Sequence, residues 1–148
     1  VPRGPLGGVR MSSTALTRLN GVRRTDASVD ELEAAAEDLD WRCIVLDGSE
    51  VEDRGAFLES CVDAFSLPEW FGMNWDALDE CLADLEVEGA EGVLVVWSQW
   101  GAFAEADPKD FATALDVLAS AGRGWAADGL RGGVLLVGEG PDLDVEEL

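Results

Sequence analysis

This chain of 148 residues is strongly acidic: 31 Asp and Glu outnumber 10 Lys and Arg, a net charge of −21, which disfavours nucleic acid and favours cationic partners. Hydrophobic residues make up 47% of the chain and include six Trp and five Phe, enough for the core of one domain and too many for a disordered acidic chain. No stretch reaches the roughly 20 apolar residues of a membrane span, and histidine, which metal sites and acid–base catalysis near neutral pH use most, is absent.

The first 27 residues show neither helical nor strand periodicity. They are rich in Gly, Arg, Ser and Thr, and residues 1–25 contain five Arg but no acid, which leaves a net charge of −26 for residues 26–148. We expect residues 1–27 to be disordered, either as a leader or as a sequence left over from cloning. A helix is then predicted over residues 28–40, as an extension before the main domain, because Ser28 and Glu31 have the spacing of a capping box.

Three apolar runs of strand length divide the rest of the chain. They lie at residues 41–46, 93–97 and 133–138. Two helices are predicted between the first and second runs, the first capped by Asp53 and the second by Asn74, and another begins at Asp107-Pro108 before the third run. Strands joined by helical crossovers favour parallel pairing. The predicted fold class is therefore α/β, a small three-stranded parallel sheet covered by helices over residues 41–138, followed by a loose acidic tail at 139–148.

The predicted helix over residues 75–85 separates apolar from acidic side chains. Its apolar stripe consists of Trp75, Leu78, Cys81, Leu82 and Leu85, and its other face carries Asp76, Asp79, Glu80 and Ala83. Like charges at these spacings destabilise a helix by roughly 0.2–0.5 kcal/mol per pair, and a cationic partner would convert that repulsion into attraction. An ordinary solvated face is the alternative. Trp70, just ahead of the helix, is of the residue type most enriched at binding hot spots.

Residues 67–82 read Leu-Pro-Glu-Trp-Phe-Gly-Met-Asn-Trp-Asp-Ala-Leu-Asp-Glu-Cys-Leu, a run that resembles the signature of the barstar family. An Asp-Gly after the first predicted strand and a Trp-x-Gln (Trp97, Gln99) after the second also resemble this family, and the likeness extends over about residues 42–138. The resemblance implies a three-stranded parallel fold whose second helix, with the preceding loop, plugs the active site of a secreted microbial ribonuclease.

The resemblance also implies roles for individual positions. Asp76 matches the first contact acid of the family and Glu80 its dominant acid, with one methylene more, while Trp70 matches the contact aromatic and Asn74 the helix cap. Asp79 stands where the family often has an aromatic, Ala83-Asp84-Leu85 replaces its Gly-aromatic turn, and a later contact acid is absent near Ser120. The residues predicted to bind the partner are Trp70, Asn74, Asp76, Asp79, Glu80, Ala83 and Asp84.

We therefore expect a stoichiometric inhibitor that forms a 1:1 complex with a microbial extracellular ribonuclease, is monomeric when free, and uses no cofactor, metal, membrane or nucleic acid. Three cysteines (Cys43, Cys61 and Cys81) without CxxC spacing argue against a disulfide framework or a zinc site and fit a reduced, cytoplasmic location.

Two alternatives stay open at this point. One is an acidic module that binds a basic protein other than a ribonuclease, or the chain's own Arg-rich residues 1–25. The other is an enzyme in which Asp76 pairs with Asp79 or Glu80 as in a glycosidase. The convex face on which these acids lie and the lack of a Gly-rich phosphate loop disfavour the enzyme.

Overall fold

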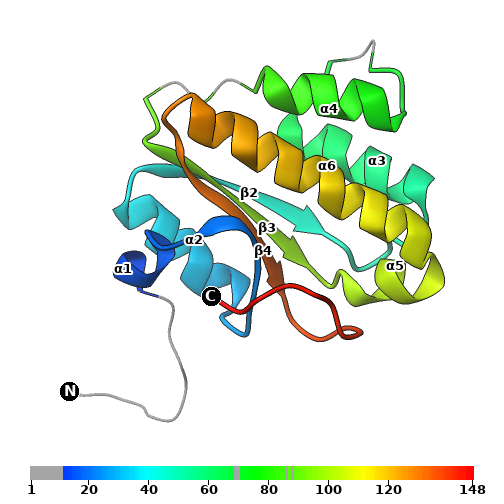
Figure 1. The fold of residues 1–148 in the computed structure, drawn as a ribbon, viewed down its shortest axis with the longest axis horizontal. Helices are drawn as coiled ribbons and strands as arrows, with labels where there is room; N and C mark the ends of the chain where they lie inside the picture. Colours follow the sequence, from blue (N-terminus) through cyan, green and yellow to red (C-terminus); the bar gives the residue numbers. More distant parts are fainter. Residues whose placement is uncertain (1–11, 69–70, 86, 88) are drawn as a thin grey trace.

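Four parallel strands form a single sheet with helices on both faces (Figure 1). The computed structural model describes residues 12–148 except residues 69, 70, 86 and 88. The strands lie in the order β1-β4-β3-β2, and each neighbouring pair is parallel. Their bounds are Asn20–Thr25 (β1), Trp41–Asp47 (β2), Gly92–Ser98 (β3) and Arg131–Val137 (β4). The predicted α/β class with a parallel sheet is confirmed, but the prediction of three strands is wrong, because there are four.

The additional strand, β1, lies in the segment for which the sequence predicts disorder. It pairs with β4, so that Val22 lies opposite Val134, and the short helix α1 (Ser13–Leu16) precedes it. The expectation of disorder is therefore wrong for residues 12–27, while residues 1–11 lie outside the described part of the chain. The sequence of β1, Asn-Gly-Val-Arg-Arg-Thr, shows no alternation of apolar and polar residues. This edge strand is held mainly by backbone hydrogen bonds to β4 and less by burial of its own side chains, so a hydrophobic pattern does not reveal it.

One face of the sheet is covered by α1 and α2 (Val29–Asp38), as Figure 1 shows. The predicted cap of α2 is confirmed, since the Ser28 hydroxyl accepts a hydrogen bond from the Glu31 N–H at 3.1 Å. The buried residues of α2 pack with Trp41 of β2 and with apolar side chains of β3 and β4. This helix therefore lies directly on the sheet as one of its covering layers.

The other face carries the larger core, beneath the remaining helices. These are α3 (Arg54–Phe65), α4 (Trp75–Ala83), α5 (Gly101–Ala106) and α6 (Pro108–Ala127). The predicted caps are again present: the side chain of Asp53 accepts from the Ala56 N–H, and that of Asp107 from the Asp110 N–H. Fully buried Phe57 lies at the centre of an aromatic cluster, 4.9 Å from Trp97 between ring centroids. Strand β3 alternates between this core and the opposite one and is buried on both faces, as its continuous apolar run predicts.

The acidic tail after β4 is not loose. Its last residues run beside β1, where the Arg24 N–H donates to the Glu146 carbonyl and the Leu148 N–H donates to the Arg24 carbonyl, both at 2.9 Å. Arg23 forms an ion pair with Glu146, and the Arg24 guanidinium lies 4.8 Å from the centre of the Trp100 ring. The prediction of a loose tail is wrong because the edge of β1 offers unpaired backbone groups that the tail satisfies.

Deletion of residues 143–148 is expected to destabilise the protein by about 1–3 kcal/mol, the usual worth of two backbone hydrogen bonds. Urea unfolding monitored by tryptophan fluorescence measures the change. The matched control is Glu146→Gln, which removes an exposed ion pair but keeps the backbone contacts and is expected to cost less than about 1 kcal/mol. An unchanged unfolding midpoint in the truncated chain would show that the tail does not stabilise β1.

Candidate functional site

Helix α4 owes its position to a local cap and to an apolar stripe. The Asn74 side chain accepts a hydrogen bond from the Ala77 N–H at 2.8 Å and donates one to the Gly72 carbonyl at 3.1 Å. Leu78 and Leu82 are fully buried, and the Trp125 indole N–H of α6 donates to the Leu82 carbonyl at 3.0 Å. Both predictions, the Asn74 cap and the apolar stripe, are thus confirmed. Figure 1 shows α4 at the outside of the helical layer, and the face of α4 opposite its apolar stripe is exposed.

Asn74→Ala is expected to destabilise the protein by about 0.5–2 kcal/mol, because the cap satisfies a backbone N–H that the helix itself cannot. The measurement is again the free energy of unfolding in urea. Asn74→Asp keeps the acceptor for the Ala77 N–H, though not the donor to Gly72, and should recover most of the loss. Equal stability of Asn74→Ala and the unchanged protein would contradict a role for this cap.

The outer face of α4 is an exposed acidic surface, defined here by Asp76, Asp79, Glu80 and Asp84. All four side chains are exposed, and Ala83 lies exposed among them. Among the residues that the structure describes, no Lys or Arg forms an ion pair with any of the four. The repulsion between these carboxylates is therefore uncompensated within the described chain, and only Asp76 lies in the first turn, where the helix dipole favours an acid.

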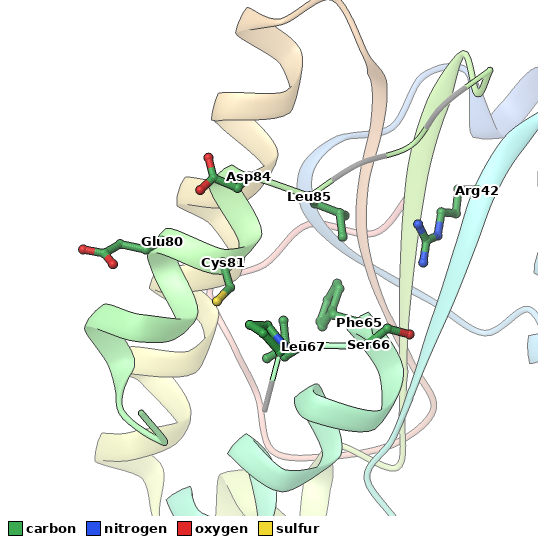
Figure 2. A pocket seen from close by; sticks show the side chains of 9 residues that line it. Arg42, Phe65, Ser66, Leu67, Glu80, Cys81, Asp84 and Leu85 are labelled. Atoms are coloured by element: carbon green, nitrogen blue, oxygen red, sulfur yellow. The ribbon is translucent and has the colours of Figure 1, made fainter. Parts of the chain in front are cut away.

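A cavity of about 440 Å³ lies behind this acidic surface, between α4, the end of α3 and β2. Figure 2 shows Arg42, Phe65 and Leu85 directed toward it, whereas Glu80 and Asp84 border it but point their carboxylates away. Burial, together with the nearby charges of Glu80 and Asp84, raises the pKa of the Cys81 thiol at its wall. The thiol therefore stays protonated and is a poor nucleophile. Among the described residues, Glu80 and Asp84 therefore do not form the pair of facing carboxylates that a glycosidase uses.

The structure gathers six of the seven predicted partner-binding residues on α4 and its two flanking residues. Asn74 precedes the helix, Asp84 follows it, and Asp76, Asp79, Glu80 and Ala83 lie on its exposed side. Trp70 lies outside the described residues. Contact with a partner stays a prediction for all seven.

Sequence reasoning passed over Met73, which directly precedes the cap. Its side chain is 41% exposed, and its backbone has a φ of +49°. The sequence gives no local signal for this conformation, because the residues that adopt the left-handed region readily, Gly72 and Asn74, lie on either side of Met73.

No group of three or more His, Cys, Asp or Glu side chains in the described part of the chain is arranged to hold a metal ion. No described helix combines the length and the apolar character needed to cross a membrane.

Comparison with known proteins identifies the family. A solved structure of the ORC2 protein from Aeropyrum pernix, in ADPNP-ADP complexes, superposes with a TM-score of 0.53 at 17% identity, over 86% of this chain and 40% of that protein. This likeness concerns the fold alone, and the chain spans well under half of that protein. No curated protein matches the chain significantly. The sequence model of the family described as Barstar (barnase inhibitor) matches residues 41–136, from the start of β2 into β4. The chain therefore belongs to the barstar family of barnase inhibitors.

Proposed function

We propose that this protein is a stoichiometric inhibitor of a secreted microbial ribonuclease, and that the acidic surface on α4 occupies the active site of that enzyme. The observation that carries the proposal is the set of exposed carboxylates at Asp76, Asp79 and Glu80, which no described cation neutralises. Membership of a family of barnase inhibitors supports a ribonuclease as the partner.

The physical mechanism is imitation of the substrate's charge. A ribonuclease must hold RNA phosphates in a cationic groove, and carboxylates on a rigid helix present negative charge to the same groups. The groove and the helix face cannot both be occupied, so inhibition competes with RNA. The net charge of −21 adds long-range attraction, which raises the association rate at low ionic strength.

The acidic residues on α4 contribute differently to binding, according to their position on the helix. Asp76 lies in the first turn on a helix held by the Asn74 cap and by Leu78, so its carboxylate is carried on a firm support. Glu80 lies one turn further along the helix. Its side chain, longer than that of an aspartate, reaches the cationic groove of the enzyme but has more conformational freedom to lose on binding. Asp79 and Asp84 flank these two and extend the negative field to both sides of the contact.

We propose a 1:1 complex, a monomer in the absence of the enzyme, and a cytoplasmic location, without catalysis or a cofactor. The three free thiols of Cys43, Cys61 and Cys81 fit a reducing compartment. The contact lies at the phosphate-binding groove of the enzyme and not at a remote surface.

The decisive experiment is a titration of secreted guanyl-type microbial ribonucleases with the purified protein. At enzyme concentrations well above the dissociation constant, activity should fall linearly to an endpoint at one inhibitor per enzyme, and added RNA should compete. A basic protein without nuclease activity serves as a control for unspecific charge attraction. If the protein inhibits no ribonuclease of the panel but binds the basic control protein, it is a general acidic binding module and the proposal fails.

A further inference from the structure

Met73 is the one large hydrophobic side chain that is exposed among the described residues, at 41%. Single exposed apolar residues are common on protein surfaces, so exposure alone carries little meaning. Four non-glycine residues of the described chain have a φ in the left-handed region, and Met73 is the only apolar one among them. Its φ of +49° lies in the left-handed region, which glycine and asparagine occupy readily and which a methionine adopts at a cost.

The neighbouring residues hold Met73 in this conformation. The Asn74 side chain bonds the Gly72 carbonyl on one side and the Ala77 N–H on the other, and thus spans the backbone around Met73. Phe71, two residues earlier, is buried and anchors the turn to the core. A glycine at position 73 would take the same conformation without strain, so the turn geometry does not require a methionine.

The position of Met73 adjoins the acidic surface. It lies immediately before the N-cap of α4 and three residues before Asp76, at the end of the helix that the proposed function places in the enzyme. An exposed apolar residue beside uncompensated carboxylates matches the usual anatomy of an interface, in which apolar anchors lie next to charged pairs. Strained backbone positions cluster at binding and catalytic sites, and Met73 combines such a position with an exposed apolar side chain.

We infer that Met73 is an apolar anchor of the inhibitor, which inserts its thioether side chain into a hydrophobic depression at the rim of the ribonuclease's cationic groove. The inference rests on the proposed function and extends it, because it adds an apolar contact to an otherwise electrostatic recognition surface. The flexible, polarisable side chain of methionine suits an irregular depression. The partner is therefore a ribonuclease with an apolar patch next to its phosphate-binding residues.

The test separates stability from affinity. Met73→Gly should raise the urea midpoint, since it relieves the left-handed strain, and yet weaken inhibition by about tenfold or more, the scale of one hot-spot side chain. Met73→Ala should weaken inhibition similarly without the gain in stability, and Met73→Leu should stay within about threefold of the unchanged protein. Gln99→Gly is the matched control, because Gln99 is exposed, has a φ of +52° and lies after β3. It should gain stability and keep full inhibition.

The outcomes distinguish a failure of the Met73 anchor from a failure of the proposed function. If the unchanged protein inhibits a ribonuclease but Met73→Gly and Met73→Ala do so equally well, the anchor is refuted and the proposed function stands. If the unchanged protein inhibits no ribonuclease of the panel, both are refuted. A loss of inhibition in Gln99→Gly as large as that in Met73→Gly would assign the effect to the backbone and also refute the anchor.

Discussion

Glu80→Ala and Asp76→Ala are each expected to weaken the complex with the target ribonuclease by about 2–5 kcal/mol, which corresponds to roughly 30-fold to several-thousand-fold in the dissociation constant. The physical reason is that each change leaves a cationic group of the enzyme desolvated in the interface without its partner. Most of the loss should appear as faster dissociation, since truncation of a buried charge pair acts on the dissociation rate. Surface plasmon resonance or stopped-flow fluorescence measures both rate constants.

The matched control for this prediction is Glu37→Ala. Glu37 is an exposed acid on α2, which covers the opposite face of the sheet. Its removal therefore makes the net charge less negative by one unit, as Asp76→Ala and Glu80→Ala do, but leaves α4 unchanged. It should change only the association rate, and only at low ionic strength. Changes near 0.3 kcal/mol for both Asp76 and Glu80, the size expected of a peripheral exposed charge, would show that the acidic surface is not the interface.

Phe57→Ala is expected to destabilise the protein by about 3–5 kcal/mol, the usual cost of removing a large buried aromatic side chain. Phe57 is fully buried, and its ring lies within 6 Å of those of Trp75, Trp97 and Phe103 between centroids. The loss combines the transfer of apolar surface to water with a cavity that the surrounding aromatics cannot fill. Urea unfolding at equilibrium measures it.

The contact between Phe57 and Trp75 makes this change informative for the site as well. Trp75 is the first residue of α4, so a cavity beneath it should loosen the support of the acidic surface and weaken inhibition in proportion. Glu59→Ala, an exposed change on the same helix α3, should alter stability by less than about 0.5 kcal/mol. If Phe57→Ala costs less than about 1 kcal/mol, the aromatic cluster does not act as the centre of the core.

The features that depend on near neighbours in the chain were predictable from the sequence. The caps at Ser28, Asp53, Asn74 and Asp107 each involve a hydrogen bond to a backbone N–H three residues later, which spacing alone reveals. The division of α4 into an apolar stripe and an acidic face follows from helical periodicity in the same way. Burial of β3 on both faces followed from its unbroken apolar run.

Only the tertiary structure decided the edge of the sheet and the exposure of Met73. Strand β1 and the tail carry no apolar pattern because their order comes from ladders to partners more than 100 residues away, such as Asn20 with Gly132 and Arg24 with Glu147. Pairing over such separations depends on which backbone groups the fold leaves unpaired, and a local pattern does not contain that information. The left-handed conformation of Met73 likewise results from a turn that must join the buried Phe71 to a helix capped by Asn74. The sequence by itself thus determined four of the six described helices (α2, α3, α4 and α6), three of the strands and the acidic surface, because these are local. Helix α1, the fourth strand and the exposed methionine arise from contacts that exist only once the chain has folded.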